Sequence, residues 1–140
     1  MTRRSTWEAD LSAYIASRRD ASFEWGKTDC AMFFAGAVLA MTGDDPAEPF
    51  RDKYDSEMGA AKALLKYGAG TLEATLDALF EPIPTGFIRR GDGVWNGEAV
   101  GVCVGEYALF MGRSVTAEGQ EIHEGLIRVP RAEWNGGWRV

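Results

Sequence analysis

The sequence predicts one α+β domain, with helices in its N-terminal half and a small antiparallel sheet after them. Up to residue 80 the apolar residues recur at helical spacing, and after residue 86 they fall into short runs separated by glycine. The length of 140 residues suits a single domain, and 46% hydrophobic with 26% charged residues is ordinary for a chain with a core. We therefore expect one domain over residues 1–140, without a linker.

The first helix is predicted over residues 6–18. Ser5 and Glu8 have the spacing of a capping box at its start. Apolar residues then recur on one helix face, at Trp7, Leu11, Tyr14 and Ile15. A short aromatic connection, residues 23–26, follows this helix, and Gly26 within it can adopt backbone angles that other residues resist.

The second helix is predicted over residues 29–40, with Thr28 as its N-cap. It is apolar nearly all round, which is typical of a buried helix. Gly43 suits a left-handed C-cap, and Pro46 prevents continuation. The apolar run of residues 31–41 is about half the length that crosses a bilayer, so we expect a core helix and no membrane span.

Two shorter helices should follow. Asp55 or Ser56 can cap the first, which Gly68 closes, and Thr71 can cap the second, which the prolines after Phe80 end. Their apolar positions are Met58, Ala61, Leu64 and Leu65 in the first, and Leu72, Leu76, Leu79 and Phe80 in the second.

The second half of the chain predicts strands. Short runs with strand character cover residues 93–95, 100–104, 107–111 and 126–129. Val100, Val102 and Val104 alternate with smaller residues, as in a strand. The polar stretch 116–124 is predicted as a hairpin tip or a connecting loop.

Charge and composition argue against several classes of function. A net charge of −6 repels polyanions, and the short arginine pairs are scattered, so we expect no nucleic-acid partner. Cys30 and Cys103 lie far apart and should both be reduced, because no secretory signal is visible. With a single histidine, His123, no metal-ligand spacing exists. We expect neither a metal nor another cofactor.

Cys30 is the strongest candidate for a chemically reactive side chain. In the first turn of a helix, exposed amides and the helix dipole stabilise a thiolate and can activate a nucleophile. The alternative is that Cys30 is a small buried apolar side chain, which is common for free cysteine. Physical reasoning alone leaves both open.

Three segments resemble the NlpC-type cell-wall peptidases, which have a papain-like fold. Residues 23–38, FEWGKTDCAMFFAGAV, resemble the aromatic-Gly-x-x-Asp-Cys segment that opens the central helix of that family. Residues 91–94 resemble its Gly-Asp turn into a strand, and residues 99–105 resemble the next strand. The resemblance covers about half the chain. It implies Cys30 as the nucleophile, with Asp29 beside it in the site.

The whole layout looks still more like a branch of small phage and prophage proteins of this superfamily. Four motifs carry that resemblance: WGKTDC at 25–30, TGDDP at 42–46, FRDKYD at 50–55 and GWRV at 137–140. Their joint occurrence is more specific than any one of them. It implies a protein associated with a phage tail.

The base that such a peptidase needs is absent from its usual place. The family has its catalytic histidine at the start of the strand after the Gly-Asp turn, where this sequence has Ala99. His123 comes later in the chain and is a weak candidate base. Its neighbours Glu121 and Glu124 are typical of a solvated surface residue. Without acid–base help the rate typically falls about 10²–10⁴-fold, so an efficient amidase is not expected.

These observations favour a tail component of a phage or gene-transfer agent, with an NlpC-type scaffold that docks at the tail tip and a degenerate peptidase site. Tail-tip or hub proteins would be its partners, with peptidoglycan as a further candidate, and it would pass from the bacterial cytoplasm to the virion tail. The alternatives are an active tail-carried peptidoglycan amidase or endopeptidase, and a free cytoplasmic protein with a small-molecule pocket. We expect an exposed apolar docking patch at residues 134–140 or at the strand edges.

Overall fold

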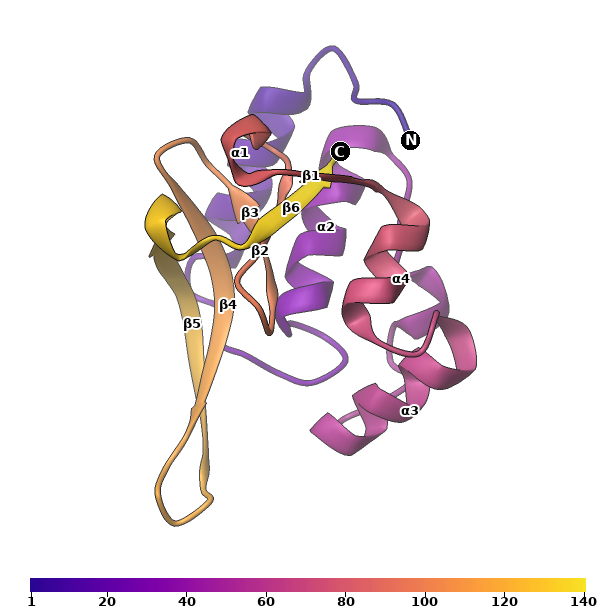
Figure 1. Ribbon diagram of the computed structural model, residues 1–140, viewed down its shortest axis with the longest axis vertical. Helices are drawn as coiled ribbons and strands as arrows, with labels where there is room; N and C mark the ends of the chain where they lie inside the picture. The colour runs from indigo at the N-terminus through magenta and orange to yellow at the C-terminus, as the bar shows by residue number, and fades with distance from the viewer.

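A computed structural model describes residues 1–140. Helices occupy the first half of the chain and strands the second (Figure 1). This arrangement confirms the predicted α+β class. The helices are α1 (Trp7–Arg18), α2 (Cys30–Thr42), α3 (Glu57–Tyr67) and α4 (Leu72–Leu79), with short 3-10 turns η1 (Glu48–Phe50), η2 (Thr85–Phe87) and η3 (Arg131–Glu133). The strands are β1 (Glu81–Ile83), β2 (Gly93–Trp95), β3 (Val100–Cys103), β4 (Tyr107–Val115), β5 (Glu121–Pro130) and β6 (Gly136–Arg139).

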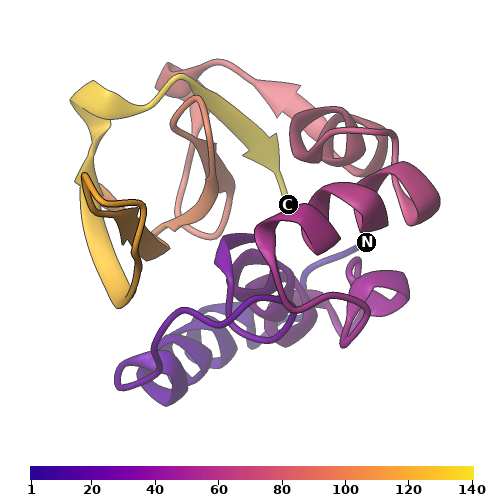
Figure 2. The same cartoon turned by 90° about the horizontal axis from the view of Figure 1, so that it is seen from below.

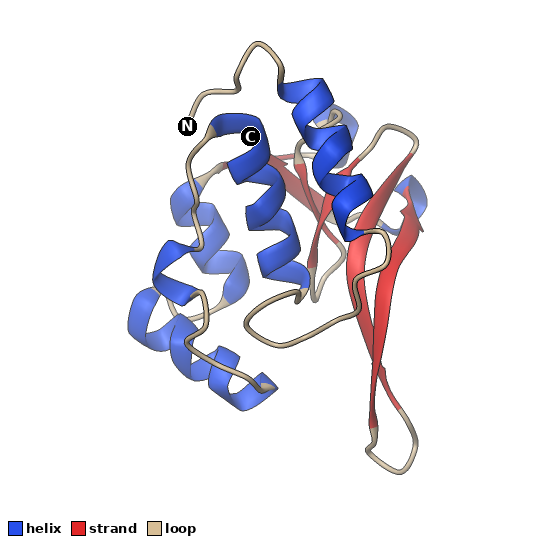
Figure 3. Cartoon of the chain, turned by 180° about the vertical axis from the view of Figure 1, so that it is seen from behind, coloured by secondary structure: helices blue, strands red, loops and turns tan.

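The six strands form one antiparallel sheet in the order β1-β6-β2-β3-β4-β5. Strands β2 to β5 follow one another in both sequence and space. Strand β6 departs from that order, because it inserts between β1 and β2 and pairs with both of them. The β4–β5 hairpin is the longest pair, and its tip projects beyond the rest of the molecule (Figures 1 and 3).

Helix α2 lies at the centre, between the sheet on one side and α3 with α4 on the other (Figures 1 and 3). Seen from below, the strands gather on one side of the molecule and the helices on the other (Figure 2). The main core joins Phe33, Phe34 and Val38 of α2 to Val100 and Val102 of β3. No helix has both the length and the apolar character that a membrane crossing requires.

The opposite face of β3 packs into a second apolar cluster. Cys103 points into it together with Val94, Phe110 and Trp134. Because side chains alternate along a strand, Val100 and Val102 face α2 whereas Cys103 faces away from it. Cys103 is fully buried and reduced, so it belongs to the packing of this second cluster.

The predicted helices are all present, but two predicted caps are wrong. Thr6 precedes α1 and makes no capping bond, because its hydroxyl binds the Asp10 carboxylate instead, and the capping box expected at Ser5 does not form. Asp29, one residue after the predicted Thr28, caps α2. The caps predicted at Ser56 and Thr71 are confirmed, as is the left-handed conformation of Gly43, with φ of 85°.

The sheet is larger than the sequence predicted. Strands β1 and β6 were not expected, and β4 and β5 extend further toward the hairpin tip than predicted. Residues 121–124, predicted within a loop, begin β5, so only residues 116–120 form the tip. A long hairpin can continue through polar residues because its backbone pairing does not depend on a buried face.

The C-terminal segment does not form the expected docking patch. Trp134 and Trp138 are buried, and their indole nitrogens donate to the Val129 carbonyl and the Asp77 carboxylate at 3.0 and 2.8 Å. The two tryptophans are therefore core residues, and β6 lies inside the sheet, whereas Asn135 and Arg139 are exposed but polar. At the strand edges, the other expected place, the edge strand β5 carries exposed Ile122 and Ile127, and the most exposed large apolar side chains are Met58 and Leu65 of α3 and Phe87 of η2.

Candidate functional site

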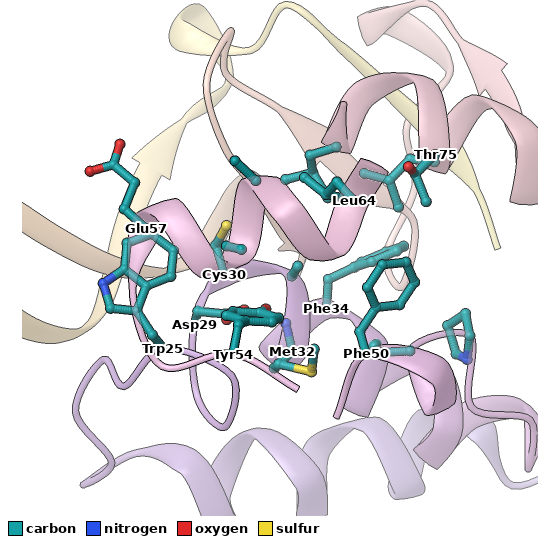
Figure 4. A pocket seen from close by; sticks show the side chains of 18 of the residues that line it. Trp25, Asp29, Cys30, Met32, Phe34, Phe50, Tyr54, Glu57, Leu64 and Thr75 are labelled. Carbon is teal, nitrogen blue, oxygen red and sulfur yellow. The ribbon is translucent and has the colours of Figure 1, made fainter. Parts of the chain in front are cut away.

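Cys30 is the first residue of α2 and packs in the main core cluster with Val100 and Val102 of β3, as predicted. Its sulfur faces a pocket of about 310 Å³ (Figure 4). The pocket lies between α2 and the α3–α4 pair. Trp25 and Glu57 stand at one end of it, near Cys30, and Phe34 and Phe50 at the other (Figure 4).

Asp29 holds the start of α2 in place. Its carboxylate is only 2% exposed and accepts three hydrogen bonds, from the backbone N–H groups of Gly26 and Met32, both at 2.9 Å, and from the Tyr54 hydroxyl. All of these donors belong to the protein, so the carboxylate has little capacity left for a substrate or a proton relay. Asp29, predicted as a site residue, is thus a positioning residue that fixes Cys30 beside the pocket.

Gly26 allows the chain to turn tightly before α2. Its φ is +81°, a left-handed conformation that other residues resist. A β-carbon at this position would lie 2.1 Å from the Tyr54 carbonyl oxygen. The backbone of the loop between η1 and α3 therefore comes so close to residue 26 that only glycine fits. Both the backbone conformation and the lack of space for a side chain therefore require glycine at this position of WGKTDC.

The motifs at 25–30, 42–46 and 50–55 come together around α2. Asp45 of the second motif binds the Arg51 guanidinium of the third through two contacts, at 2.6 and 3.1 Å. Arg51 thereby fixes the loop in which Tyr54 reaches Asp29. Pro46 and Phe50 also line the pocket. The three motifs build one structural unit, the pocket wall around Cys30.

Burial raises the pKa of the Cys30 thiol to about 11. Backbone N–H groups of Val100 and of the helix start lower it, but by less than desolvation raises it, and the nearby Asp29 charge raises it further. The stabilised thiolate that a helix N-terminus can produce is therefore not realised. The raised pKa favours the protonated thiol at neutral pH. Cys30 is half-buried, however, with its sulfur toward the pocket, and so differs from the buried apolar side chain of the alternative interpretation.

Ala99 directly precedes β3, next to Val100, whose backbone contacts the Cys30 sulfur. Position 99, where the resemblance expects the catalytic base, thus lies one residue from the backbone group that contacts the Cys30 sulfur. The Ala99 methyl group, however, packs against the second cluster with Cys103, on the sheet face away from α2. Neither the residue type nor the direction of its side chain supplies a base to Cys30.

His123 is brought to a different place. It lies on β5 with its side chain 42% exposed, and its Nε2 contacts Glu121 Oε1 at 2.8 Å. The same Glu121 oxygen accepts a hydrogen bond from Trp25 Nε1 at 2.7 Å. His123 lines a separate open polar hollow, and Trp25 and Tyr54 line both that hollow and the Cys30 pocket. His123 and Cys30 thus line different hollows, and the histidine is a surface residue as expected.

Sequence reasoning missed the residues at the pocket mouth. Arg113 of β4 forms an ion pair with Glu57 of α3 at 3.2 Å, and its guanidinium lies 4.8 Å from the centre of the Trp25 ring. Glu98 lines the pocket from the turn before β3. These residues come from three distant parts of the chain and share no local pattern. Of the apolar positions predicted for α3, Ala61 and Leu64 line the pocket, whereas the charged residues at its mouth gave no sequence signal.

The raised pKa of Cys30 predicts slow alkylation at neutral pH. With iodoacetamide, the rate at Cys30 should rise about tenfold per pH unit from pH 7 to pH 10 without a plateau, because only about one thiol in ten thousand is ionised at pH 7. Mass spectrometry of tryptic peptides separates Cys30 from the buried Cys103. An early plateau, at pH 6 to 8, would instead reveal an activated thiolate and contradict the assignment.

The chain belongs to the family described as a domain of unknown function (DUF6950), whose model matches residues 2–140. The match spans the N-terminal helices, the Cys30 pocket and the complete sheet. No curated protein and no solved structure matches the chain.

Proposed function

We propose that this DUF6950 protein is a tail component of a phage or gene-transfer agent, in which a papain-like, NlpC-type scaffold serves docking and not hydrolysis. The observation that carries the non-catalytic part is the state of Cys30: its thiol has a raised pKa, and His123 binds Glu121 at another site. The tail location rests on the resemblance of the four sequence motifs to phage and prophage proteins.

A cysteine peptidase needs a thiolate or a nearby base, and then an acid that protonates the leaving amine. Asp29 and Tyr54, which interact electrostatically with Cys30, bind each other. Glu57, at the same end of the pocket, is paired with Arg113. Burial and the adjacent Asp29 charge raise the pKa of Tyr54, so its phenol stays protonated and cannot act as a base at neutral pH. The absence of an activated thiol and of a free base beside it supports a docking role over acyl transfer.

The experiment that tests this function combines two measurements. Mass spectrometry of purified phage-like particles from the source bacterium should detect the protein as a component of the particle. The purified chain should release no more peptide from peptidoglycan than its Cys30→Ala variant does. Absence from particles contradicts the tail location. Cys30-dependent release contradicts the non-catalytic role and supports the amidase alternative.

A further inference from the structure

The pocket beside Cys30 is an apolar cavity open to solvent. Its volume of about 310 Å³ falls at the lower end of the range of about 300–1,000 Å³ for small-molecule sites. Side chains of α2, α3 and α4 supply most of its wall, including Phe34, Leu64 and Leu76. Thr75, at the far end, has its hydroxyl bonded to the Thr71 carbonyl and the Ala69 N–H, so it offers no free polar group. That end suits a hydrocarbon.

The mouth of the pocket carries one cation, Arg113. Its side chain is 22% exposed and is held by the face of Trp25 and by Glu57, whose own side chain is 71% exposed. A largely desolvated guanidinium keeps an anionic partner, whereas an exposed glutamate returns to water at little cost. A ligand carboxylate can therefore replace Glu57 on Arg113.

The other acidic residues that line the pocket do not compete for that position. Asp29 is occupied by three protein donors. Glu98 is exposed on the turn before β3, where water and salt screen its charge. Glu121 of β5 also interacts electrostatically with Arg113, but its Oε1 is bound by Trp25 and His123. Arg113 is the only cationic side chain of the lining and favours a negative headgroup.

From this arrangement we infer that the pocket binds a single-chain aliphatic carboxylate, with its tail between α2 and α3–α4 and its headgroup on Arg113. A methylene group is close in size to a water molecule, whose share of liquid volume is about 30 Å³, so the cavity holds roughly ten carbons. The inference goes beyond the proposed tail role and does not depend on it, because a chain absent from particles could still bind the ligand.

Isothermal titration of the full chain with decanoate, below its micelle concentration, tests the inference. Binding should be 1:1 with a negative heat-capacity change. Octanoate and hexanoate should bind more weakly, by about fourfold per methylene removed, which corresponds to about 0.8 kcal/mol per buried CH₂. Decylamine should bind at least tenfold more weakly than decanoate. No saturable decanoate binding at millimolar concentration, or equal affinity for decylamine, overturns the inference.

Three variants locate the site. Arg113→Gln should weaken decanoate binding at least tenfold, whereas Glu57→Gln should strengthen it several-fold, because it removes the competing carboxylate. Ala60→Phe should fill the cavity and abolish binding. Ala78→Phe is its matched control, since Ala78 is an exposed α4 residue outside the pocket lining. Unchanged affinity in Ala60→Phe, or weaker binding in Glu57→Gln, overturns the assignment even if decanoate binds elsewhere.

Discussion

Replacing Asp29 with alanine should lower the free energy of unfolding by about 3–7 kcal/mol. The change removes the N-cap of α2, which is worth about 1 kcal/mol. It also leaves the Gly26 N–H and the Tyr54 hydroxyl without their acceptor, at about 1–3 kcal/mol for each buried group. Urea denaturation followed by circular dichroism measures the loss, and an unchanged m-value would show that the denatured state is not altered.

Two further variants divide that effect. Tyr54→Phe removes one hydrogen bond to a carboxylate and should cost about 1.5–3 kcal/mol. Asp44→Ala changes an exposed carboxylate near the other end of α2 and should stay within about 0.5 kcal/mol of the parent. If Asp29→Ala loses no more than Asp44→Ala, the hydrogen-bond network does not stabilise the helix start as described.

Gly26→Ala should destabilise the protein by about 2–5 kcal/mol. The left-handed backbone at φ of +81° costs a β-carbon about 1–2 kcal/mol, and the contact with the Tyr54 carbonyl adds an overpacking cost of about 1–3 kcal/mol. Thermal and urea unfolding of the variant, with the parent measured in parallel, provide the comparison.

Gly119→Ala is the matched control, because Gly119 has nearly the same φ, +83°, and nothing within 4 Å of an added β-carbon. This variant should lose only the stability that the left-handed backbone costs a residue with a β-carbon, about 1–2 kcal/mol. The difference between the two variants isolates the close approach of the Tyr54 backbone. Equal losses would mean that the loop at Tyr54 moves away freely and that the contact does not constrain the pocket wall.

The helical half of the fold could be predicted because its signals are local. Ser56 and Thr71 cap helices whose apolar periodicity follows directly in sequence. Thr28 and Asp29 are both good cap residues, and the choice of Asp29 depends on Tyr54, 25 residues away. Local pattern cannot decide between neighbouring caps when a distant hydroxyl group stabilises one of them.

Strands β1 and β6 escaped prediction for a different reason. They have three and four residues and contain Pro82, Gly136 and Gly137, which are unfavourable in strands by propensity. Gly137 lies so near to the Gly93 backbone that a β-carbon would be 2.1 Å from its carbonyl oxygen, so close pairing between strands favours glycine there. Contacts over about fifty residues override the local preference, and they leave no periodic signal.

The candidate site was predicted in its centre and missed at its rim. Cys30 and Asp29 follow from a short motif and lie where it places them, whereas the environment that raises the pKa of the thiol is formed by packing from other elements. Arg113 and Glu57 meet across 56 residues of chain, and each is an unremarkable charged residue in its own segment. Charged residues at a pocket mouth that come from distant segments can be recognised only from the tertiary structure.

The position of β6 within the sheet has a consequence for how the chain folds as it is synthesised. Strands β1 and β2 are made more than forty residues before β6, yet they are joined only through it. Until residues 136–139 have left the ribosome, β1 has no strand partner and one edge of β2 remains unpaired and able to associate with other chains. Helices and the β2–β5 hairpins can form earlier, because their contacts are local. Closure of the sheet is therefore a late event, and it makes nascent chains that stall shortly before β6 the species most prone to aggregate.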